Sequence, residues 1–207
     1  EREPAPRWRA CGVYTSPATV SALRRLGLAD DVIAPLARPV PGLRVESRRG
    51  ATFRLAYAES DGTGSGRGDR ACAVGLARPA FDALLIEMAQ AAGADVRRGA
   101  RVVGVRQEAA GRWRLELADG GTVAADLVVG ADGPRSTIAR TMGVEAHAPI
   151  RRRIGLTFHI DDPAGERIHD ARIVVLPDGY VGLAPVPGAR LNIGIVLWGA
   201  WLERVRR

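Results

Sequence analysis

The 207-residue sequence has no lysine, two cysteines, 5% aromatic residues and no long run of apolar residues. Cys11 and Cys72 alone do not form the disulfide framework of a small secreted protein, which favours a reducing compartment such as the cytoplasm. Neither cysteine has a histidine cluster at metal-ligand spacing, so the sequence predicts no metal site. The longest apolar runs, such as 127–129, are too short to cross a bilayer. Residues 1–10 are charged and proline-rich, so we expect no signal peptide there.

The net charge of +7 comes from arginine, because all 30 basic residues are arginines. A nucleic-acid-binding surface usually concentrates its positive charge on one face or arm. Here the arginines are scattered, with small clusters at 24–25, 48–49, 97–98 and 151–153, which is typical of solvated faces. We therefore expect no nucleic-acid partner.

Local patterns predict a mixed α/β first part. Ser16 and Pro17 are a helix N-cap and first helical residue, and an apolar stripe predicts a second helix over 79–92. Strands are expected within 40–58, and a glycine-rich loop is expected over 59–70. Further strands are expected at 95–98, in a meander of 101–107, 113–118 and 122–125, and at 127–129, followed by a helix over 135–142. The uniformly apolar 127–129 predicts a strand buried on both faces.

The pattern changes after Pro149. Long strands are expected near 151–160, 171–177, 180–185 and 190–198, with no helix among them, which predicts an antiparallel sheet. The fold class is therefore α/β in the first part and α+β in the second, with a boundary near residue 150.

The Gly-Ala-Asp-Gly turn at 130–133 carries the clearest functional signal. A buried parallel strand delivers its carboxyl end to the crevice where α/β sheets bind ligands. Gly130 and Gly133 let a ligand approach the main chain, and the Asp132 carboxylate can accept hydrogen bonds from sugar hydroxyls. Arg135 and Ser136 place donors at a helix start, which favours an anion. This combination suits a nucleotide cofactor; the alternative is that Asp132 only caps the helix and the glycines make a tight turn.

This segment resembles the Asp-Gly motif of FAD-dependent hydroxylases of the p-hydroxybenzoate hydroxylase fold. The order of elements is also similar: a helix that begins with arginine, within the stretch 77–99, a Val-Val-Gly-Val strand, a meander, the Asp-Gly turn and an antiparallel sheet. The resemblance implies a partial Rossmann-like FAD-binding domain over 1–150, with an inserted substrate-side segment at about 40–75. Residues 151–207 would belong to the antiparallel substrate-binding domain.

The same resemblance implies further FAD contacts. Glu1 would bind the adenosine ribose, Arg9 would lie near the pyrophosphate or the flavin, and Arg78 would reach the cofactor. Val103 would touch the adenine through its main chain. The alternatives are ordinary surface or structural roles for the two arginines and a meander core position for Val103. The stretch "ACGVYTSPATVSALRRLGL" is similar to the geranylgeranyl-reductase-like branch.

Two motifs of the family are missing from the sequence. No strand–GxGxxG–helix precedes the chain's first elements, and no second Gly-Asp motif follows the substrate sheet. We therefore expect that about 30 residues before Glu1 and a longer stretch after Arg207 belong to the family's complete pattern.

Three hypotheses about function follow. The first is an FAD-dependent monooxygenase that uses NAD(P)H and dioxygen on a small hydrophobic, aromatic or polyketide-like substrate; the flavin would carry the chemistry, so no nucleophilic side chain is required. The second is a flavin-dependent reductase of isoprenoid double bonds, which the Cys-Gly segment favours and the absence of a W.FP pattern at 180–185 disfavours. The third is a non-catalytic fragment that binds no flavin. Tyr180, Asn192, His159 and His169 receive no catalytic role.

Overall fold

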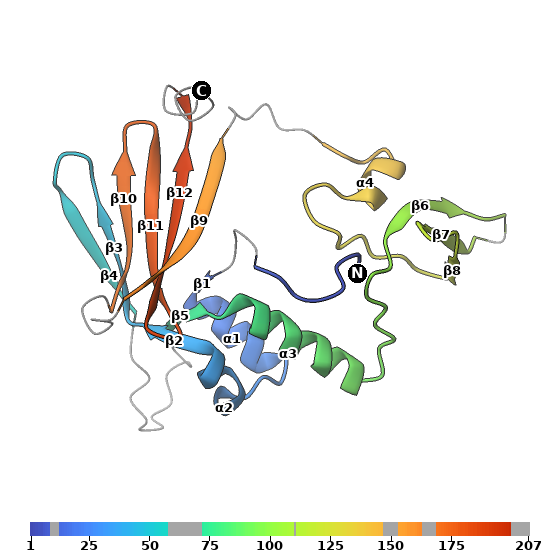
Figure 1. Ribbon diagram of the computed structural model, residues 1–207, viewed down its shortest axis with the longest axis horizontal. Helices are drawn as coiled ribbons and strands as arrows, with labels where there is room; N and C mark the ends of the chain where they lie inside the picture. The colour runs from blue at the N-terminus through green and yellow to red at the C-terminus, as the bar shows by residue number, and fades with distance from the viewer. Residues whose placement is uncertain (9–12, 58–71, 110, 147–152, 163–168, 200–207) are drawn as a thin grey trace. The chain divides into compact units, whose positions relative to one another are not determined.

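The computed structural model describes residues 1–8, 13–57, 72–109, 111–146, 153–162 and 169–199 (Figure 1). Arg9 lies outside these residues. The chain divides into two compact units, of which unit 1 comprises 1–6 and 83–150 and unit 2 comprises 7–82 and 151–207. The predicted assignment of an FAD-binding and a substrate-binding domain stays a prediction, because the units are defined by contacts and not by ligands.

Unit 2 contains the first predicted helix, α1 (Pro17–Arg25). The Ser16 hydroxyl accepts a hydrogen bond from the Thr19 backbone N–H at 3.4 Å, and Pro17 occupies the first turn, where its missing N–H costs nothing. Gly27 follows the helix with φ +89°, a left-handed conformation that glycine adopts without a steric penalty. Two short helical segments come next, α2 (Asp30–Ile33) and the 3-10 helix η1 (Ala34–Leu36).

Two sheets make up the rest of unit 2. The smaller has the order β1-β5-β2 and the larger the order β4-β3-β10-β11-β12-β9 (Figure 1). Their strands are β1 (Tyr14–Thr15), β2 (Ala37–Val40), β3 (Gly42–Glu46), β4 (Thr52–Ala56), β5 (Ala73–Leu76), β9 (Ile154–Asp161), β10 (Ala171–Leu176), β11 (Gly179–Val186) and β12 (Arg190–Leu197). The four long strands predicted after residue 150 are confirmed as β9 to β12, and their mutual pairing is antiparallel.

The larger sheet also recruits a hairpin from far upstream in the sequence. β3 pairs in parallel with β10, placing Leu43 opposite Ala171, and β4 continues the sheet beyond β3. A small core forms where the two sheets meet, with Val40, Ala73 and Ala171 buried. The 40–58 segment therefore belongs structurally with the long strands.

The close approach of the two sheets depends on one glycine. A Cβ atom at Gly75 of β5 would lie 1.8 Å from the Pro185 carbonyl oxygen of β11, a distance that no side chain can tolerate. Gly75 has no positive φ, so packing and not backbone conformation requires glycine there.

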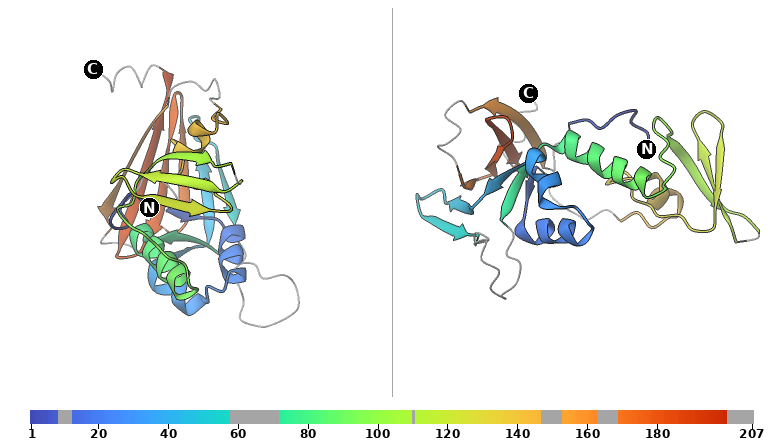
Figure 2. Two further views of the ribbon diagram at one scale, coloured as in Figure 1. Left: turned by 90° about the vertical axis from the view of Figure 1, so that its right-hand side faces the viewer. Right: turned by 90° about the horizontal axis from the view of Figure 1, so that it is seen from below.

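Unit 1 contains most of α3 (Arg78–Ala91), the meander β6 (Val102–Gln107), β7 (Trp113–Leu117) and β8 (Thr122–Ala125), and the short helix α4 (Thr137–Thr141). The meander and the second helix are confirmed within one or two residues, and α4 is shorter than predicted. Figure 2 shows the three meander strands side by side, in the order β6-β7-β8.

Two predicted strands of unit 1 are wrong. Residues 95–98 and 127–129 are not strands, and Leu127 and Val129 are 77% and 78% exposed. A strand needs a hydrogen-bonded neighbour, and no segment of the described residues forms a ladder with either stretch. Instead, 95–100 makes two isolated backbone bonds with Glu1, from the Glu1 amino group to the Arg97 carbonyl and from the Ala100 N–H to the Glu1 carbonyl.

We expect Gly75→Ala to lower the free energy of unfolding by at least about 3 kcal/mol, the upper end of typical overpacking costs, because the new methyl group has no space. Gly155→Ala in β9 is the matched control, since a Cβ atom there meets nothing within 4 Å. Urea unfolding of both variants checks this. A Gly75→Ala protein as stable as the Gly155→Ala protein would contradict the packing described here.

Candidate functional site

The Asp132 carboxylate lies at the N-terminus of α4. Its Oδ2 atom accepts hydrogen bonds from the backbone N–H groups of Thr137 at 2.6 Å and Ile138 at 3.3 Å. The Ser136 side chain, followed by these backbone donors, holds the pKa of Asp132 below its ordinary value. The carboxylate is exposed, so it is ionised at neutral pH and open to solvent while it caps the helix. Helix capping, the structural alternative for Asp132, is therefore present.

Glycine is needed at positions 130 and 133 for different structural reasons. A Cβ atom at Gly130 would come within 3.1 Å of the Ile138 side chain, so glycine allows α4 to approach the chain closely. Gly133 has φ +86° and nothing within 4 Å of its Cβ position, so its backbone conformation requires glycine and leaves open space above it.

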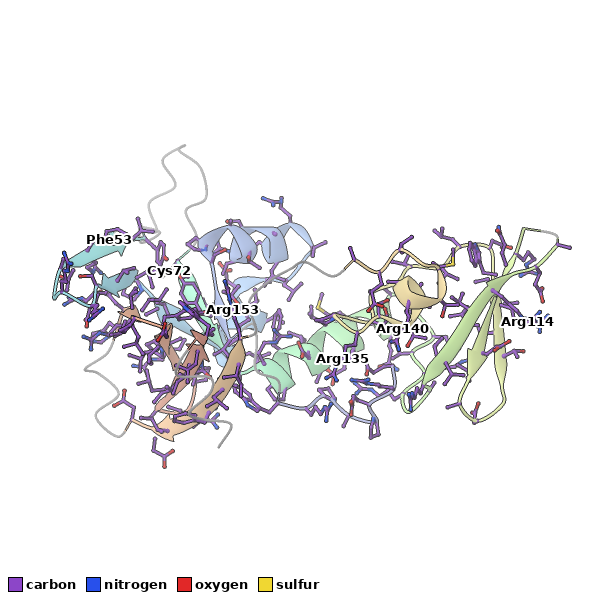
Figure 3. The ribbon with its side chains drawn as sticks, turned by 90° about the horizontal axis from the view of Figure 1, so that it is seen from above. Phe53, Cys72, Arg114, Arg135, Arg140 and Arg153 are labelled. Atoms are coloured by element: carbon purple, nitrogen blue, oxygen red, sulfur yellow. The ribbon has the colours of Figure 1, made fainter. Side chains whose placement is uncertain are left out.

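Arg135 precedes α4 and Arg140 lies in its last turn (Figure 3). Arg140 Nη2 donates to the Arg135 carbonyl at 3.3 Å, and the Ser136 hydroxyl accepts from the Ala139 N–H at 2.9 Å. Within the described residues, the Arg135 guanidinium itself takes part in no hydrogen bond or ion pair, and the residue is exposed. The turn therefore presents one carboxylate and one cation to solvent from neighbouring positions.

The remaining predicted cofactor residues lie elsewhere. Glu1 is exposed, and its Oε1 accepts from the Glu3 N–H at 3.0 Å. Arg78, at the start of α3, is partly buried and donates to Asp82 through Nε at 3.1 Å and Nη2 at 3.2 Å. Val103 is 47% exposed and sits at the register shift between Val102 and Gly104 of β6. The register shift leaves Val103 without a cross-strand partner in the β6–β7 pairing, as in a β-bulge.

Unit 2 forms a cavity of about 370 Å³ on one face of the larger sheet, a volume in the roughly 300–1,000 Å³ range of small-molecule sites. Asp132 is not among its lining residues. The lining residues come from β3, β9, β10, β11 and β12 and from Val13 and Tyr14. The lining is mostly apolar and includes Leu43, Ala171, Ile173, Ala184 and Val196.

Tyr14, Thr157 and Asn192 are polar residues of this lining, and Tyr57, outside the lining, bonds to Tyr14. Tyr14 and Tyr57 share a short hydroxyl–hydroxyl hydrogen bond, and burial together with Tyr57 raises the pKa of Tyr14 well above its ordinary value. The Tyr14 hydroxyl therefore stays protonated throughout the physiological range. On the β9 and β12 strands, the Thr157 hydroxyl donates to Asn192 Oδ1 at 3.0 Å, which leaves the Asn192 amide N–H groups as donors.

The cavity carries no uncompensated charge in its described lining. Arg172 is its only formally charged residue. Arg172 pairs across the sheet with Leu183, whereas the neighbouring Ile173 pairs with Gly182, so the two side chains lie on opposite faces. The Arg172 guanidinium forms an ion pair with Glu46 on the face away from Ile173.

His159 pairs with Asn192 and therefore lies on the cavity side of β9. It is not one of the lining residues. Its ring packs edge-on against Trp8 with 4.3 Å between centroids. Burial, and then Arg190, lower the pKa of His159, so it is neutral at physiological pH. Its aromatic contact supports the structural role expected for this histidine.

Sequence reasoning did not select Tyr14, Thr157, Gly182 or Gly194 as site residues. The available signal was glycine in the interior of a strand, which often marks a close approach to a ligand. The sequence gives Tyr180 and Asn192 no catalytic role, and the structure shows that both line the cavity.

In the part of the chain that the structure describes, no helix combines the length and apolarity needed to cross a membrane. In these same residues, no three His, Cys, Asp or Glu side chains gather closely enough to hold a metal ion.

The Asp-Gly turn of unit 1 and the apolar cavity of unit 2 lie in a chain that matches a family of FAD-binding proteins. The family model described as "FAD binding domain" matches residues 1–191, and the chain belongs to this family. The resemblance inferred from the Asp-Gly turn and the order of elements is thereby confirmed.

The curated proteins that are similar to this chain include a reductase and a monooxygenase. The chain is 28% identical over 199 residues to the menaquinone reductase of Mycolicibacterium smegmatis, which covers 92% of this chain and 46% of that protein. It is 30% identical over 141 residues to the rifampicin monooxygenase of Rhodococcus hoagii, covering 68% of this chain and 26% of that protein. The chain thus spans less than half the length of these relatives.

Among solved structures, the flavin-dependent halogenase CmlS aligns with the whole chain at a TM-score of 0.77 and 25% sequence identity, covering 38% of that protein. Both units of the present fold therefore occur together in a known flavoprotein.

We expect Asp132→Ala to lower the free energy of unfolding by about 1 kcal/mol at pH 7, the typical net contribution of a hydrogen bond, because the Thr137 and Ile138 N–H groups lose their acceptor while the Ser136 N-cap remains. Because folding lowers the pKa of Asp132, this stabilisation is present above the ordinary aspartate pKa of about 3.9 and is lost as the pH falls through the lowered folded-state pKa. Asp132→Asn keeps an acceptor oxygen and should retain most of the stability.

Urea unfolding at several pH values measures this difference. Asp126→Ala, which removes only an exposed pair with Arg112, is the matched control. An Asp132→Ala effect that is no larger than the Asp126→Ala effect at pH 7 would show that the cap does not stabilise the fold.

Proposed function

We propose that this chain is the nucleotide-side and substrate-side part of an FAD-dependent monooxygenase that uses NAD(P)H and dioxygen to hydroxylate a small apolar substrate. The observation that carries the proposal is the apolar cavity of about 370 Å³ on the sheet of unit 2, in a chain that belongs to an FAD-binding family. The relative named rifampicin monooxygenase also favours oxygen insertion.

The residues of unit 1 fit the polar part of FAD. The exposed Asp132 carboxylate has a second oxygen, Oδ1, with which it can accept a hydrogen bond from a sugar hydroxyl while Oδ2 caps α4. The Arg135 guanidinium can pair with a phosphate, and the open space at Gly133 admits a ligand to the main chain. The bulge at Val103 supports the proposed main-chain contact with the adenine. Glu1, Arg9, Arg78 and Gly130 remain proposed contacts on the family pattern.

The overall reaction balances with these reactants. NAD(P)H supplies a hydride, which carries two electrons and one proton, and the solvent supplies a second proton. One oxygen atom of O₂ enters a substrate C–H bond, and the other leaves as water. When bound, FAD supplies the electron-transfer chemistry between the nicotinamide and oxygen. This chain's own groups bind and orient: the apolar walls exclude water, and the Tyr14 hydroxyl and Asn192 amide offer hydrogen bonds to substrate oxygens.

A flavin-dependent reductase of isoprenoid double bonds is the second candidate. The relative named menaquinone reductase, which aligns over 92% of this chain, favours a reductive reaction. In that case the same cavity would hold part of an apolar chain, and the two electrons would saturate a carbon–carbon double bond without consuming oxygen.

The natural protein that contains this sequence should purify with flavin absorption bands. In it, Asp132→Asn and Arg135→Ala should each weaken FAD binding about tenfold, because each loses a charge-assisted hydrogen bond. Arg112→Ala, which removes an exposed arginine from the same unit, should leave FAD affinity within twofold. A well-folded but colourless natural protein that does not take up added FAD would overturn the flavin assignment and favour a non-catalytic protein.

Oxygen consumption separates the two reactions. With NAD(P)H and oxygen, a hydroxylase should consume oxygen faster in the presence of a neutral aromatic compound and release its hydroxylated product, which mass spectrometry detects as a gain of one oxygen atom. Anaerobic saturation of a prenyl chain at the expense of NAD(P)H, without any oxygenated product in air, would instead establish the reductase.

A further inference from the structure

We propose that Gly155, Gly182 and Gly194 form a side-chain-free floor of the unit 2 cavity, on which a flat, uncharged ring system lies, and that these glycines determine which substrates fit. The three residues are called the glycine floor below. This inference rests on the proposed function in one respect, which is that the ligand of the cavity is taken to be the substrate.

Neither conformation nor packing requires glycine at these positions. None of the three has a positive φ, so any residue can adopt their extended backbone. A Cβ atom at Gly155 would meet nothing within 4 Å, and at Gly182 and Gly194 it would meet only a backbone oxygen at 3.8 and 3.9 Å. Gly75 and Gly179 of the same unit differ, because there a Cβ atom would lie 1.8 and 2.3 Å from backbone oxygens.

Glycine in a strand interior destabilises a protein by roughly 0.5–1 kcal/mol relative to alanine. Three such positions without a structural requirement point to a ligand that approaches the backbone closely.

The three glycines lie on one face of three neighbouring strands. Gly182 of β11 pairs directly with Gly194 of β12, which in turn pairs with Thr157 of β9. Gly155 lies two residues before Thr157, and residues two apart in a strand face the same side. All three line the cavity. Gly182 and Gly194 are thus a directly paired side-chain-free patch, and Gly155, which pairs with Val196, is the diagonal neighbour of Gly194. The surface at these positions is the backbone of the sheet, which matches the flat face of a ring system.

The charges around the cavity determine which flat ligands it can bind. The Arg172 guanidinium is held by Glu46 on the other face of the sheet, so the described lining presents no free cation to a carboxylate. Arg190, the next cation on the cavity face of β12, lies outside the lining and donates through Nε to the Pro187 carbonyl at 3.4 Å. Transferring an unpaired carboxylate into this apolar space is unfavourable, so a neutral ligand is preferred.

Two residues of the cavity lining supply neutral hydrogen-bonding groups. The Tyr14 hydroxyl and the Asn192 amide can bind a hydroxyl or carbonyl oxygen of the ligand without a charge on either partner. The chemical class is therefore a fused aromatic or quinone-like ring system with one or two neutral oxygen substituents.

The test uses two probes of the same ring system, 2-naphthol and 2-naphthoate, with isothermal titration calorimetry on the natural protein and no electron donor. Wild-type protein should bind 2-naphthol at least tenfold more tightly than 2-naphthoate. Gly182→Val should weaken 2-naphthol binding at least tenfold, and Gly182→Ala should give a smaller loss. Val181→Leu, which enlarges a side chain of β11 on the opposite face, is the matched control and should change affinity less than twofold.

Thermal unfolding verifies that the variants are folded, and the open Cβ positions predict that Gly182→Ala and Gly194→Ala melt no lower than wild type. If Gly182→Val fails to fold, Gly194→Ala and Gly155→Ala carry the same binding test. Equal 2-naphthol affinity in folded glycine variants and wild type, no 2-naphthol binding at all, or tighter binding of 2-naphthoate would overturn the proposal. The flavin bands are recorded separately, so loss of probe binding in a yellow protein refutes the glycine floor and leaves the FAD assignment standing.

Discussion

The parallel pairing of β3 with β10 is the constraint on which unit 2 depends. It joins segments that are more than a hundred residues apart and makes them one sheet, with Leu43 opposite Ala171. Two ion pairs reinforce this junction, Arg172 with Glu46 and Arg54 with Asp170 at 2.6 Å. The same junction brings β2 and β5 against β11, because the hairpin β3–β4 follows directly after β2. Without it, the cavity would lose Leu43 of β3 from its lining.

Glycine has two opposite uses within this one unit. At Gly75 it allows two sheets to pack so closely that a methyl group has no room, and this close packing buries apolar surface. In the glycine floor it leaves room that the protein itself does not fill. The first kind stabilises the fold and the second kind lowers its stability in exchange for a binding surface. Only the surroundings of each Cβ position distinguish them, because the backbone is extended at all of these residues.

The turn at 130–133 combines helix capping with an exposed carboxylate. Asp132 uses one carboxylate oxygen for the amides of Thr137 and Ile138, while Ser136 supplies the next amide of α4 with its acceptor. The interpretation of this motif as a nucleotide contact and its interpretation as a helix cap therefore do not exclude each other. Leu127 and Val129, just before the turn, are exposed and do not form the buried strand predicted from the sequence.

Local sequence patterns alone determined the elements whose stabilising contacts are close in sequence: the start of α1 at Ser16 and Pro17, the apolar stripe of α3, the meander and the four long strands. The Asp-Gly turn likewise identified the family. Tertiary structure decided whatever requires a distant partner: the recruitment of β3 into the large sheet, the loss of strand structure at 127–129, and the meeting of Tyr14, Gly182 and Asn192 around one cavity. The physical reason is that periodicity and capping act over a few residues, whereas strand pairing depends on which neighbour is available anywhere in the chain.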